Sequence, residues 1–508
     1  MKFTLSWLRE HLDFTVPLDE IVSKLNAIGL EVESVENPAD SLRGFRVAKI
    51  LEAHRHPDAD RLQVCVVAAG GDYEKVQVVC GAPNARAGLH VIFAPPGTYI
   101  PGSDITIKAG KIRGQESGGM LCSLRELGLG AESDGIAELP ENVVLGQPYA
   151  DFAKLDDPVI DISITPNRGD ALSVRGIARD LAAAGLGHLK PWLVETVEGQ
   201  FASPINWDIQ YDTACPYIAG RLVRGVKNRP SPDWLRQRLE SIGLKPISAL
   251  VDITNYLTFD LGRPLHVFDA GKISGNTLSL TRAARETFRA LDGRDLVLGT
   301  DDLVIVDSAG VQSLAGLIGG EATGVSDETT DVFIEAALFD AVRIALTGRR
   351  LGIHTDARQR FERGIDPALV LPGLEAATQL ILSLCGGEAS EITSAGAVPA
   401  WQREAWLRFD RLETLGGVEI PSGEATRILE HLGFAVREQD ETRACFAVPS
   451  WRNDVATGVT LDQAPHLDPA QAQNAAASVH AIEAENDLIE EVLRIYGLDS
   501  VPPLPLPL

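Results

Sequence analysis

Cysteine is scarce in this chain. The 508 residues contain six cysteines and no Cys-x-x-Cys motif, which argues against a disulfide framework or a zinc knuckle and favours the reducing cytoplasm. No run of about twenty apolar residues is evident, so we expect no membrane span. The first residues, MKFTLSWLREHLDF, bring in charged side chains almost at once, which does not suit a signal peptide.

Positive charge is in deficit. A net charge of −25 argues against general nucleic-acid binding, although binding depends on local patches of Lys and Arg and not on the total. Two such patches exist, in residues 108–113 and 343–363. We expect an acidic protein with confined basic zones to bind one RNA in one place. The alternative for either patch is a set of solvated arginines paired with nearby acids.

Hydrophobic periodicity divides the chain into segments of different kinds. Residues 1–38 carry apolar residues at helical spacing, whereas short runs of period two begin at Phe45 and are separated by Gly, Pro and Asp. These runs favour a small barrel of the OB type, which binds oligonucleotides. Residues 203–396 mix helices and strands, and a compact winged-helix-like pattern follows from Trp401. The expected fold class is multidomain α+β.

Three later segments set isolated polar residues and glycines in apolar sequence: residues 251–269, 314–340 and 351–367. Buried polar groups must find partners or serve a ligand. Taken alone, each has a plain structural interpretation, such as a satisfied histidine, an exposed strand-end glutamate or a glycine at positive φ. The residues concerned are Thr254, Asn255, His266, Gly316, Gly319, Glu335, Thr355 and Ala357.

Together these segments resemble the editing half of the bacterial phenylalanine–tRNA ligase (phenylalanyl-tRNA synthetase) beta subunit. HPDADRL, VCGAPN and KIRGQESGGMLCS resemble the tRNA-binding domain of the same family. VPSWRNDV and NDLIEEVLRIYG resemble motifs of its fifth domain. The family continues with a catalytic-like domain and an anticodon-binding domain, so we expect this chain to be truncated at its C-terminal side relative to the family.

The resemblance implies an OB-type barrel inserted in a small α/β domain, then an α+β editing domain and a winged-helix-like module. The expected parts are a discontinuous N-terminal α/β domain (1–38 and 152–198), an OB-fold tRNA-binding domain (39–151), a B3/B4-type editing domain (199–397), a B5-type domain (398–502) with an insert (456–486), and a proline-rich tail (503–508).

The resemblance also implies an editing site that tells tyrosine from phenylalanine by its hydroxyl. A site that hydrogen-bonds a hydroxyl rejects the analogue lacking it, because a buried group is then left unpaired. Glu335 falls where the family has its tyrosine-sensing glutamate, and His266 matches the histidine near the aminoacyl ester and the terminal ribose. Thr254 and Asn255 match a polar pair lining the same cavity. The catalytic candidates are therefore His266, Glu335, Thr254 and Asn255.

Hydrolysis in the family is implied to use a positioned water, and no Ser/His/Asp triad or metal motif is visible in this region. Lys245 stands where the family usually has arginine, so the charge is kept but the planar fork is lost. The remaining substrate-binding candidates are Gly316, Gly319, Thr355 and Ala357.

Two further sets of residues follow from the resemblance. Asp487, Glu490 and Glu491 share one helical face, and the family fold brings Asp454 close to them, which implies a Mg²⁺ site with oxygen ligands. The alternative is an acidic helix start favoured by the helix dipole. If the insert loops out, Asp454 should lie near Asp487. The RNA-binding candidates are Lys108, Lys111, Arg113 and Ser117.

The function implied is that of a beta subunit that binds tRNA(Phe) and hydrolyses mischarged Tyr-tRNA(Phe). It would support, in an α₂β₂ heterotetramer, the alpha subunit that attaches phenylalanine to tRNA with ATP, and no ATP-binding motif is seen in this chain. Two alternatives stay open. A non-catalytic tRNA-binding or assembly module would bind RNA without hydrolysing an ester, and a free-standing trans-editing deacylase would act without an alpha chain.

Overall fold

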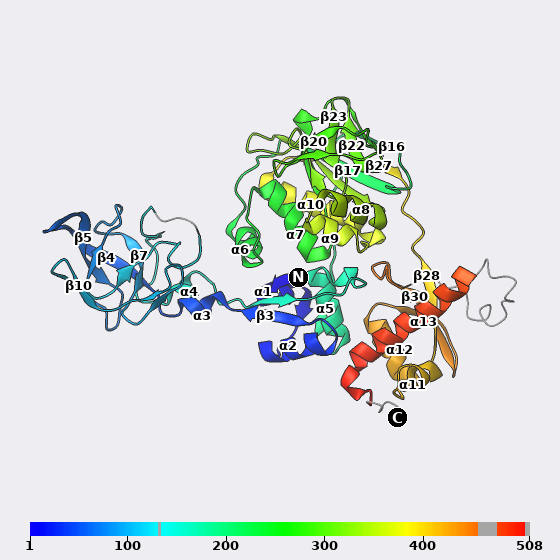
Figure 1. Ribbon diagram of the computed structural model, residues 1–508, viewed down its shortest axis with the longest axis horizontal. Coiled ribbons are helices and arrows are strands. Elements are labelled where there is room, and N and C mark those ends of the chain that lie inside the picture. The colour runs from blue at the N-terminus through cyan, green and yellow to red at the C-terminus, as the bar shows by residue number, and fades with distance from the viewer. Residues whose placement is uncertain (131–133, 456–474, 503–508) are drawn as a thin grey trace. The chain divides into compact units, whose positions relative to one another are not determined.

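The computed structural model describes residues 1–130, 134–455 and 475–502. The chain divides into two compact units, one formed by Met1–Ser34 together with Asp161–Leu508 and the other by Val35–Ile160 (Figure 1). Each unit contains both helices and strands, so the protein is a multidomain α+β protein, as its sequence predicts.

The unit Val35–Ile160 is built on a six-stranded antiparallel sheet in the order β12-β7-β4-β5-β6, with β13 also paired to β7. Two hairpins, β8–β9 and β10–β11, stand beside it. The alternation of the sequence explains the sheet, since one face buries residues such as Cys65, Val78 and Phe93. Its elements are α3 (Pro38–Leu42), β4 (Arg46–His56), β5 (Ala59–Ala68), β6 (Val76–Cys80), β7 (His90–Ala94), β8 (Tyr99–Ile100), β9 (Ile105–Thr106), β10 (Gly110–Ile112), β11 (Gln115–Ser117), β12 (Met120–Leu121), β13 (Glu138–Leu139) and α4 (Tyr149–Phe152).

The chain leaves the first unit through β3 and returns to it through β14. These two strands and β1 form a three-stranded sheet in the order β1-β14-β3, and a short pair, β2 and β15, lies apart from it. The elements here are β1 (Lys2–Thr4), α1 (Leu5–His11), β2 (Leu12–Asp13), α2 (Leu18–Ala27), β3 (Val32–Glu36), β14 (Val159–Ile162), η1 (Gly169–Ala171), α5 (Val174–Ala183) and β15 (His188–Leu189).

Two larger sheets follow in residues 201–397. One has the order β16-β19-β22-β23-β24, and the other the order β18-β25-β17-β26 with β27 also on β17. The strands are β16 (Asn206–Ile209), β17 (Tyr217–Arg224), β18 (His266–Asp269), β19 (Thr277–Arg282), β20 (Thr287–Arg289), β21 (Asp295–Val297), β22 (Leu303–Asp307), β23 (Gly310–Leu314), β24 (Ile318–Gly319), β25 (Asp331–Leu338), β26 (Glu388–Ala389) and β27 (Thr393–Gly396). The helices are α6 (Asp233–Ser241), α7 (Ala249–Leu261), η2 (Ala270–Lys272), α8 (Ala341–Leu351), α9 (Asp356–Phe361), η3 (Pro367–Leu369) and α10 (Val370–Cys385).

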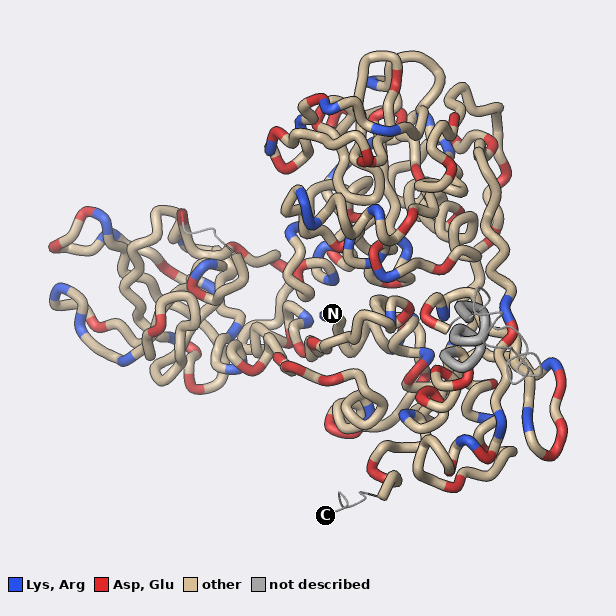
Figure 2. The backbone as a smooth tube through the Cα atoms, turned by 45° about the vertical axis from the view of Figure 1, so that its right-hand side comes forward, with Lys and Arg blue, Asp and Glu red and all other residues tan. Residues whose placement is uncertain are grey.

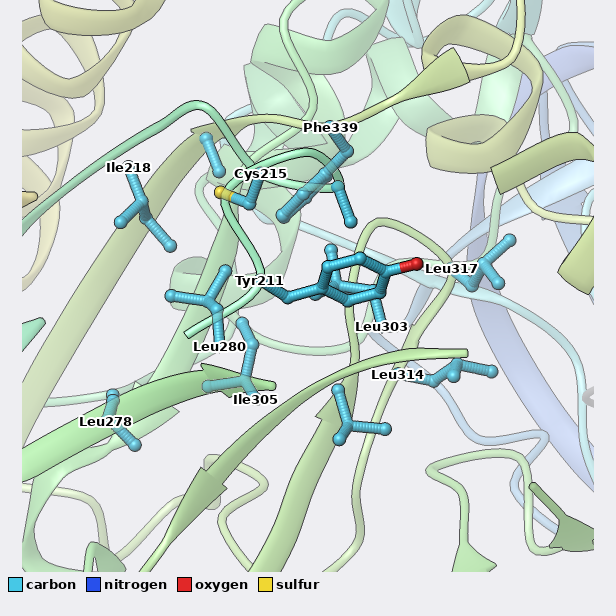
Figure 3. Packing of buried hydrophobic residues seen from close by; sticks show 14 of the residues in the cluster. Tyr211, Cys215, Ile218, Leu278, Leu280, Leu303, Ile305, Leu314, Leu317 and Phe339 are labelled. Atoms are coloured by element: carbon cyan, nitrogen blue, oxygen red, sulfur yellow. The ribbon is translucent and has the colours of Figure 1, made fainter. Parts of the chain in front are cut away.

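Strand β25 separates two hydrophobic cores. Side chains alternate along a strand. Phe333 and Ala337 therefore belong to the core shared with the β16-β19-β22-β23-β24 sheet, whereas Ile334 and Ala336 belong to the core under α7 and α10. Figure 3 shows the first of these cores, in which residues of β19, β22 and β23 pack around Tyr211. Glu335 lies on the same side of β25 as Phe333 and therefore points toward the β16-β19-β22-β23-β24 sheet.

Helix α10 is the most apolar long helix of this unit. Among the described residues, Pro367–Cys385 is long and apolar enough to cross a membrane by length and composition alone, although it includes polar residues such as Glu375 and Gln379. Its side chains Leu374, Ala377 and Ile381 are buried in the core beside β17 and β25. The apolar composition therefore serves to cover a sheet in this structure.

The C-terminal part is a three-stranded antiparallel sheet, in the order β28-β30-β29, packed against helices. Residues 456–474 of the predicted insert lie outside the described residues, and α13 begins at Ala475. Glu485, within the predicted insert, is buried and accepts hydrogen bonds from the backbone N and guanidinium of Arg408 at 2.6–3.0 Å. The end of that segment thus belongs to a core helix. The elements are β28 (Arg403–Arg408), α11 (Asp410–Thr414), α12 (Ser422–His431), β29 (Ala435–Gln439), β30 (Arg443–Val448), α13 (Ala475–Tyr496) and η6 (Leu498–Ser500).

A buried carboxylate joins α1 to α7. Asp260 accepts a hydrogen bond from Trp7 Nε1 at 2.7 Å through Oδ1, and His11 Nε2 lies 2.6 Å from the same oxygen. The Trp7 ring also stacks on Tyr256, with centroids 5.4 Å apart. This contact fixes the N-terminal helix on the helix that precedes β18.

Replacing Asp260 by alanine should lower the free energy of unfolding by about 2–4 kcal/mol, because two buried polar groups lose their partner. The matched control is Asp233→Ala, which removes an exposed carboxylate paired with Arg236 and should change stability by no more than about 0.5 kcal/mol. Urea unfolding measures both. Equal, small losses in the two variants would contradict the role given to Asp260.

Candidate functional site

The pairing of β18 with β25 brings two sequence-predicted residues together. The strands are antiparallel, and their register sets His266 opposite Glu335. Both side chains line a cavity of about 70 Å³, whose walls also include Pro264, Ser313 and Phe361. Residues that are 69 positions apart in the sequence (335 − 266) therefore share one site.

Glu335 is the acidic group of this cavity. Its side chain is 5% exposed, and the structure gives it no hydrogen bond or ion pair with another described residue. Burial raises the pKa of Glu335 to about 7, while the positive charge of Arg263 acts in the opposite direction. Both protonation states are therefore populated at neutral pH. A carboxylate can accept from a ligand hydroxyl and a carboxylic acid can donate to one, so either state can pair with it.

His266 is neutral under the same conditions. Burial lowers the pKa of its imidazole to about 4, and its ring stands edge-on to Phe268 with centroids 4.4 Å apart. A neutral imidazole has one nitrogen that accepts a hydrogen bond, so His266 can orient a water molecule or take a proton from it.

The two glycines are required by close packing. A Cβ on Gly319 would strike the imidazole ring of His266, and a Cβ on Gly316 would strike Phe339 and Ile344. Gly316 also has φ +69°, so the turn and the need for space both favour glycine there. Both positions line the cavity and leave no room for a side chain.

Thr355 and Ala357 differ in their roles. The Thr355 hydroxyl caps α9 by accepting from the Arg358 backbone N at 3.2 Å, and it donates to the Leu317 carbonyl at 3.0 Å. Those bonds hold α9 against a wall of the cavity. Ala357 lines the cavity itself, and so does Ser313, which the sequence did not single out.

Thr254, Asn255 and Lys245 are not among the residues that line this cavity. The first two lie on α7, whose apolar side packs on the opposite face of the β18–β25 sheet, and the Thr254 hydroxyl donates to the Val251 carbonyl at 2.7 Å. Lys245 is exposed in the loop before α7. The expectation that Thr254 and Asn255 share a cavity with His266 therefore does not hold in this arrangement, because the sheet stands between α7 and the cavity. The role of Lys245 in substrate binding stays a prediction.

Arg263 is a functional candidate that the sequence analysis missed. It is fully buried, its Nη2 donates to the Ala337 carbonyl, and its Nε and Nη1 have no acceptor among the described residues. Burial lowers its pKa to about 10, so it stays charged at neutral pH near Glu335. The signal was available, since LGRPLHVFD places an arginine among apolar residues just before His266.

Comparison with known proteins identifies relatives along the whole chain. Three family models match the chain: "B3/4 domain" over residues 214–386, "Putative tRNA binding domain" over 45–148 and "tRNA synthetase B5 domain" over 406–461. The chain is 72% identical over 507 residues to the phenylalanine–tRNA ligase beta subunit of Gluconobacter oxydans, covering 100% of this chain and 62% of that protein. The beta subunits of Mesorhizobium japonicum (51%) and Bradyrhizobium diazoefficiens (49%) match 100% and 99% of the chain, which covers 60% of each.

Along its whole length this chain is similar to phenylalanine–tRNA ligase beta subunits. It spans about three fifths of the length of the curated relatives it matches. The B3/4 domain match contains His266, Glu335 and both glycines of the cavity.

The basic residues expected to bind RNA lie within the family's tRNA binding domain match. Lys108 and Lys111 are exposed, and Arg113 occupies the turn of the β10–β11 hairpin at φ +47°. Ser117 is buried instead, where its hydroxyl accepts from the Val79 backbone N at 3.1 Å and donates to the Gly119 carbonyl at 3.1 Å. Ser117 therefore secures the hairpin to β6 and is not displayed for contact.

The second basic patch is only partly internal, since Arg349 and Arg350 are exposed. Arg358 and Arg360 are buried, and the Arg360 Nε donates to the Leu172 carbonyl at 3.0 Å. Lys and Arg are interspersed with Asp and Glu along both units (Figure 2). Arg358 and Arg360 pair with the nearby acids Glu362 and Asp356, as the alternative interpretation expects, but they are buried and not solvated.

The carboxylates expected to hold Mg²⁺ are held by arginines. Arg452 donates to both oxygens of Asp454 at 2.8 and 2.7 Å and lies 2.7 Å from Glu491, which Arg494 also binds. Burial alone would raise the pKa of Glu491, but Arg494, Arg452 and Arg168 keep it well below its usual range. Three positive charges at one carboxylate disfavour a divalent cation.

The residues described do not fit the predicted Mg²⁺ site. Among them, no group of three or more His, Cys, Asp or Glu side chains could hold a metal ion. Glu490 is exposed on α13, away from the buried arginine partners of Glu491. The approach of Asp454 to Asp487 stays a prediction.

Replacing Glu335 by glutamine should make stability less dependent on pH. The folded state holds the carboxyl proton up to a pKa of about 7, whereas the ordinary value is 4.5, so the unfolded state loses the proton first as pH rises. Wild-type stability should then fall by up to about 3 kcal/mol between pH 4.5 and 7 through this group, and Glu335→Gln should lack that loss. Glu328→Gln, at an exposed position, is the control. Identical slopes in wild type and Glu335→Gln would contradict the buried state.

Gly319→Ala should displace the His266 ring and destabilise the protein by about 1–3 kcal/mol, because the added carbon overlaps the imidazole. Gly423→Ala adds a carbon on α12, where nothing lies within 4 Å, and should be neutral or stabilising. Thermal unfolding and the His266 ring NMR signals report the two effects. An unchanged His266 signal in Gly319→Ala would refute the close packing.

Proposed function

We propose that this chain is the tRNA-binding and editing part of a phenylalanine–tRNA ligase beta subunit. It binds tRNA(Phe) and hydrolyses mischarged Tyr-tRNA(Phe). The observation that carries this proposal is the cavity in which Glu335 and His266 face each other across two antiparallel strands. The curated relatives are named as beta subunits of this ligase, which supports the same role.

Glu335 supplies the selection. It is a buried carboxyl with no protein partner among the described residues, so a tyrosyl hydroxyl gains a hydrogen bond that a phenylalanyl ring cannot offer. Leaving such a group unpaired costs about 1–3 kcal/mol, which favours tyrosine by roughly ten- to a hundredfold.

His266 supplies the hydrolysis. The neutral imidazole accepts a hydrogen bond from water, which directs the water oxygen toward the ester carbonyl carbon. Attack of that water breaks the bond between the tyrosyl carbonyl carbon and the ribose oxygen. The products are free tyrosine and tRNA(Phe), and no covalent enzyme intermediate is needed.

The size of the cavity favours a second candidate function. At about 70 Å³ it is smaller than the roughly 150 Å³ that accommodates benzene, so a tyrosyl ring enters only if the walls move. A cavity too small for the ring suits a tRNA-binding or assembly module that does not hydrolyse esters. Motion of Phe361 or Leu317, which line the cavity, would instead make room for the ring.

The remaining roles belong to the same proposal. The sheet of the unit Val35–Ile160 acts as an OB-type barrel that contacts tRNA through Lys108, Lys111 and Arg113, and the C-terminal part is a winged-helix-like B5 domain. The domain bounds are those expected from the sequence. A partner alpha subunit, in an α₂β₂ assembly in the cytoplasm, attaches phenylalanine to tRNA with ATP.

Deacylation of Tyr-tRNA(Phe) tests the proposal. Glu335→Ala should slow hydrolysis by at least about tenfold because the hydroxyl loses its partner, and His266→Ala should slow it because the water loses its acceptor. Glu328→Ala, at an exposed position of the same domain, should leave the rate unchanged.

Wild-type rates in both site variants would contradict the assignment of the site. Binding of tRNA(Phe) without hydrolysis by the folded wild-type chain would favour the non-catalytic module.

A further inference from the structure

A second and larger cavity lies in the unit that contains the editing site. Its volume is about 290 Å³, and none of its lining residues belongs to the His266–Glu335 cavity. Its walls come from the start of α5, the end of α7, residues 364–369 and residues 450–451. Hydrogen bonds between these segments fix the walls, including Asn453 Nδ2 to the Ile365 carbonyl at 2.9 Å.

One wall carries positive charge. Arg175 and Arg179 lie one turn apart on α5 and both line the cavity. Arg179 is 3.3 Å from Asp170, but that carboxylate is also bound by Arg168. In the described part of the chain Arg175 forms no salt bridge, and its hydrogen-bond partners are His11 Nδ1 at 3.5 Å and the Lys190 carbonyl at 3.3 Å.

The charge on Arg175 is retained at neutral pH. Burial and then the neighbouring charge of Arg179 lower its pKa to about 10. Two guanidinium groups held close together favour an anion between them, because a carboxylate pairs with both through charge-assisted hydrogen bonds.

Another wall carries a carboxylate. Asp366 accepts a hydrogen bond from the Ala368 backbone N at 2.9 Å and another from the Ser450 hydroxyl, and it forms no salt bridge with any described residue. Burial raises its pKa, while its two hydrogen bonds and the charges of Arg179 and Arg263 act in the opposite direction. A ligand that brought only an anion would leave this group unpaired.

The rest of the wall is aromatic and apolar. The Arg179 guanidinium lies over the Trp451 ring, 4.1 Å from its centroid, and Arg175 lies 6.0 Å from the centroid of the Trp192 ring. Leu261 completes an apolar surface. The Trp451 Nε1 is buried and has no acceptor among the described residues, so a ligand oxygen would satisfy it.

We propose that this cavity binds a free α-amino acid with an apolar side chain. Its carboxylate lies between Arg175 and Arg179, its ammonium group faces Asp366, and its side chain contacts the indole rings of Trp192 and Trp451. The volume lies near the lower end of the roughly 300–1,000 Å³ of small-molecule sites, which suits a ligand of this size. The site does not depend on the proposed editing function.

Isothermal titration of the whole chain with three compounds tests the charge requirement. L-Leucine should bind, whereas N-acetyl-L-leucine, which lacks the ammonium group, and 3-methylbutylamine, which lacks the carboxylate, should bind at least about tenfold more weakly. Tryptophan fluorescence should change with leucine. Leucine failing to bind, or N-acetyl-L-leucine binding as tightly as leucine, overturns the proposal.

Variants locate the ligand. Arg175→Gln and Asp366→Asn should each weaken leucine binding by at least about tenfold. Arg427→Gln, which removes an exposed arginine paired with Glu424, is the control and should bind normally. Glu335→Gln should also bind normally, which separates this cavity from the editing site. Wild-type affinity in both Arg175→Gln and Asp366→Asn places any bound leucine elsewhere and contradicts the site.

Discussion

Antiparallel pairing of β18 with β25 is the constraint on which the candidate site depends. Alternation along β25 turns Glu335 toward the β16-β19-β22-β23-β24 sheet, and the register places His266 of β18 opposite Glu335 on the same side. Ile334 and Ala336, on either side of Glu335 in the strand, face α7 and α10. A slip of one residue would bring the carboxyl of Glu335 under two apolar helices, where nothing could pair with it, so burial of the helices also fixes the register of the site.

The sequence predicted that His266 and Glu335 share a site, but it placed Thr254 and Asn255 in a cavity that they do not line. Family resemblance brought His266 and Glu335 together, although the residues alone favoured an exposed strand-end glutamate, because strand pairing across 69 residues leaves no local pattern. The resemblance also placed Thr254 and Asn255 in the same cavity, which they do not line. The turn at Gly262, in the left-handed region at φ +73°, sends the chain from helix to strand, so the helix and the cavity lie on opposite faces of the sheet.

The roles of several buried arginines could not be predicted from the sequence. The resemblance implied Asp454 and Glu491 as metal ligands, yet Arg452 pairs with both carboxylates and Arg494 pairs with Glu491. Spacing alone cannot distinguish a cation site from a buried ion-pair network, because both gather acids on one helical face. Arg263 shows the converse, since an ordinary-looking arginine in the apolar run LGRPLHVFD proves to be a buried charge that helps to set the ionisation of Glu335.

Glu335 is a buried carboxyl that is available to hydrogen-bond a hydroxyl ligand. Titration of its side-chain carboxyl by ¹³C NMR, with Glu335→Gln to assign the signal, measures this directly. The account predicts a midpoint near pH 7, raised by burial from the ordinary 4.5. A midpoint at or below 4.5 would show a solvated or ion-paired carboxylate and would contradict the account.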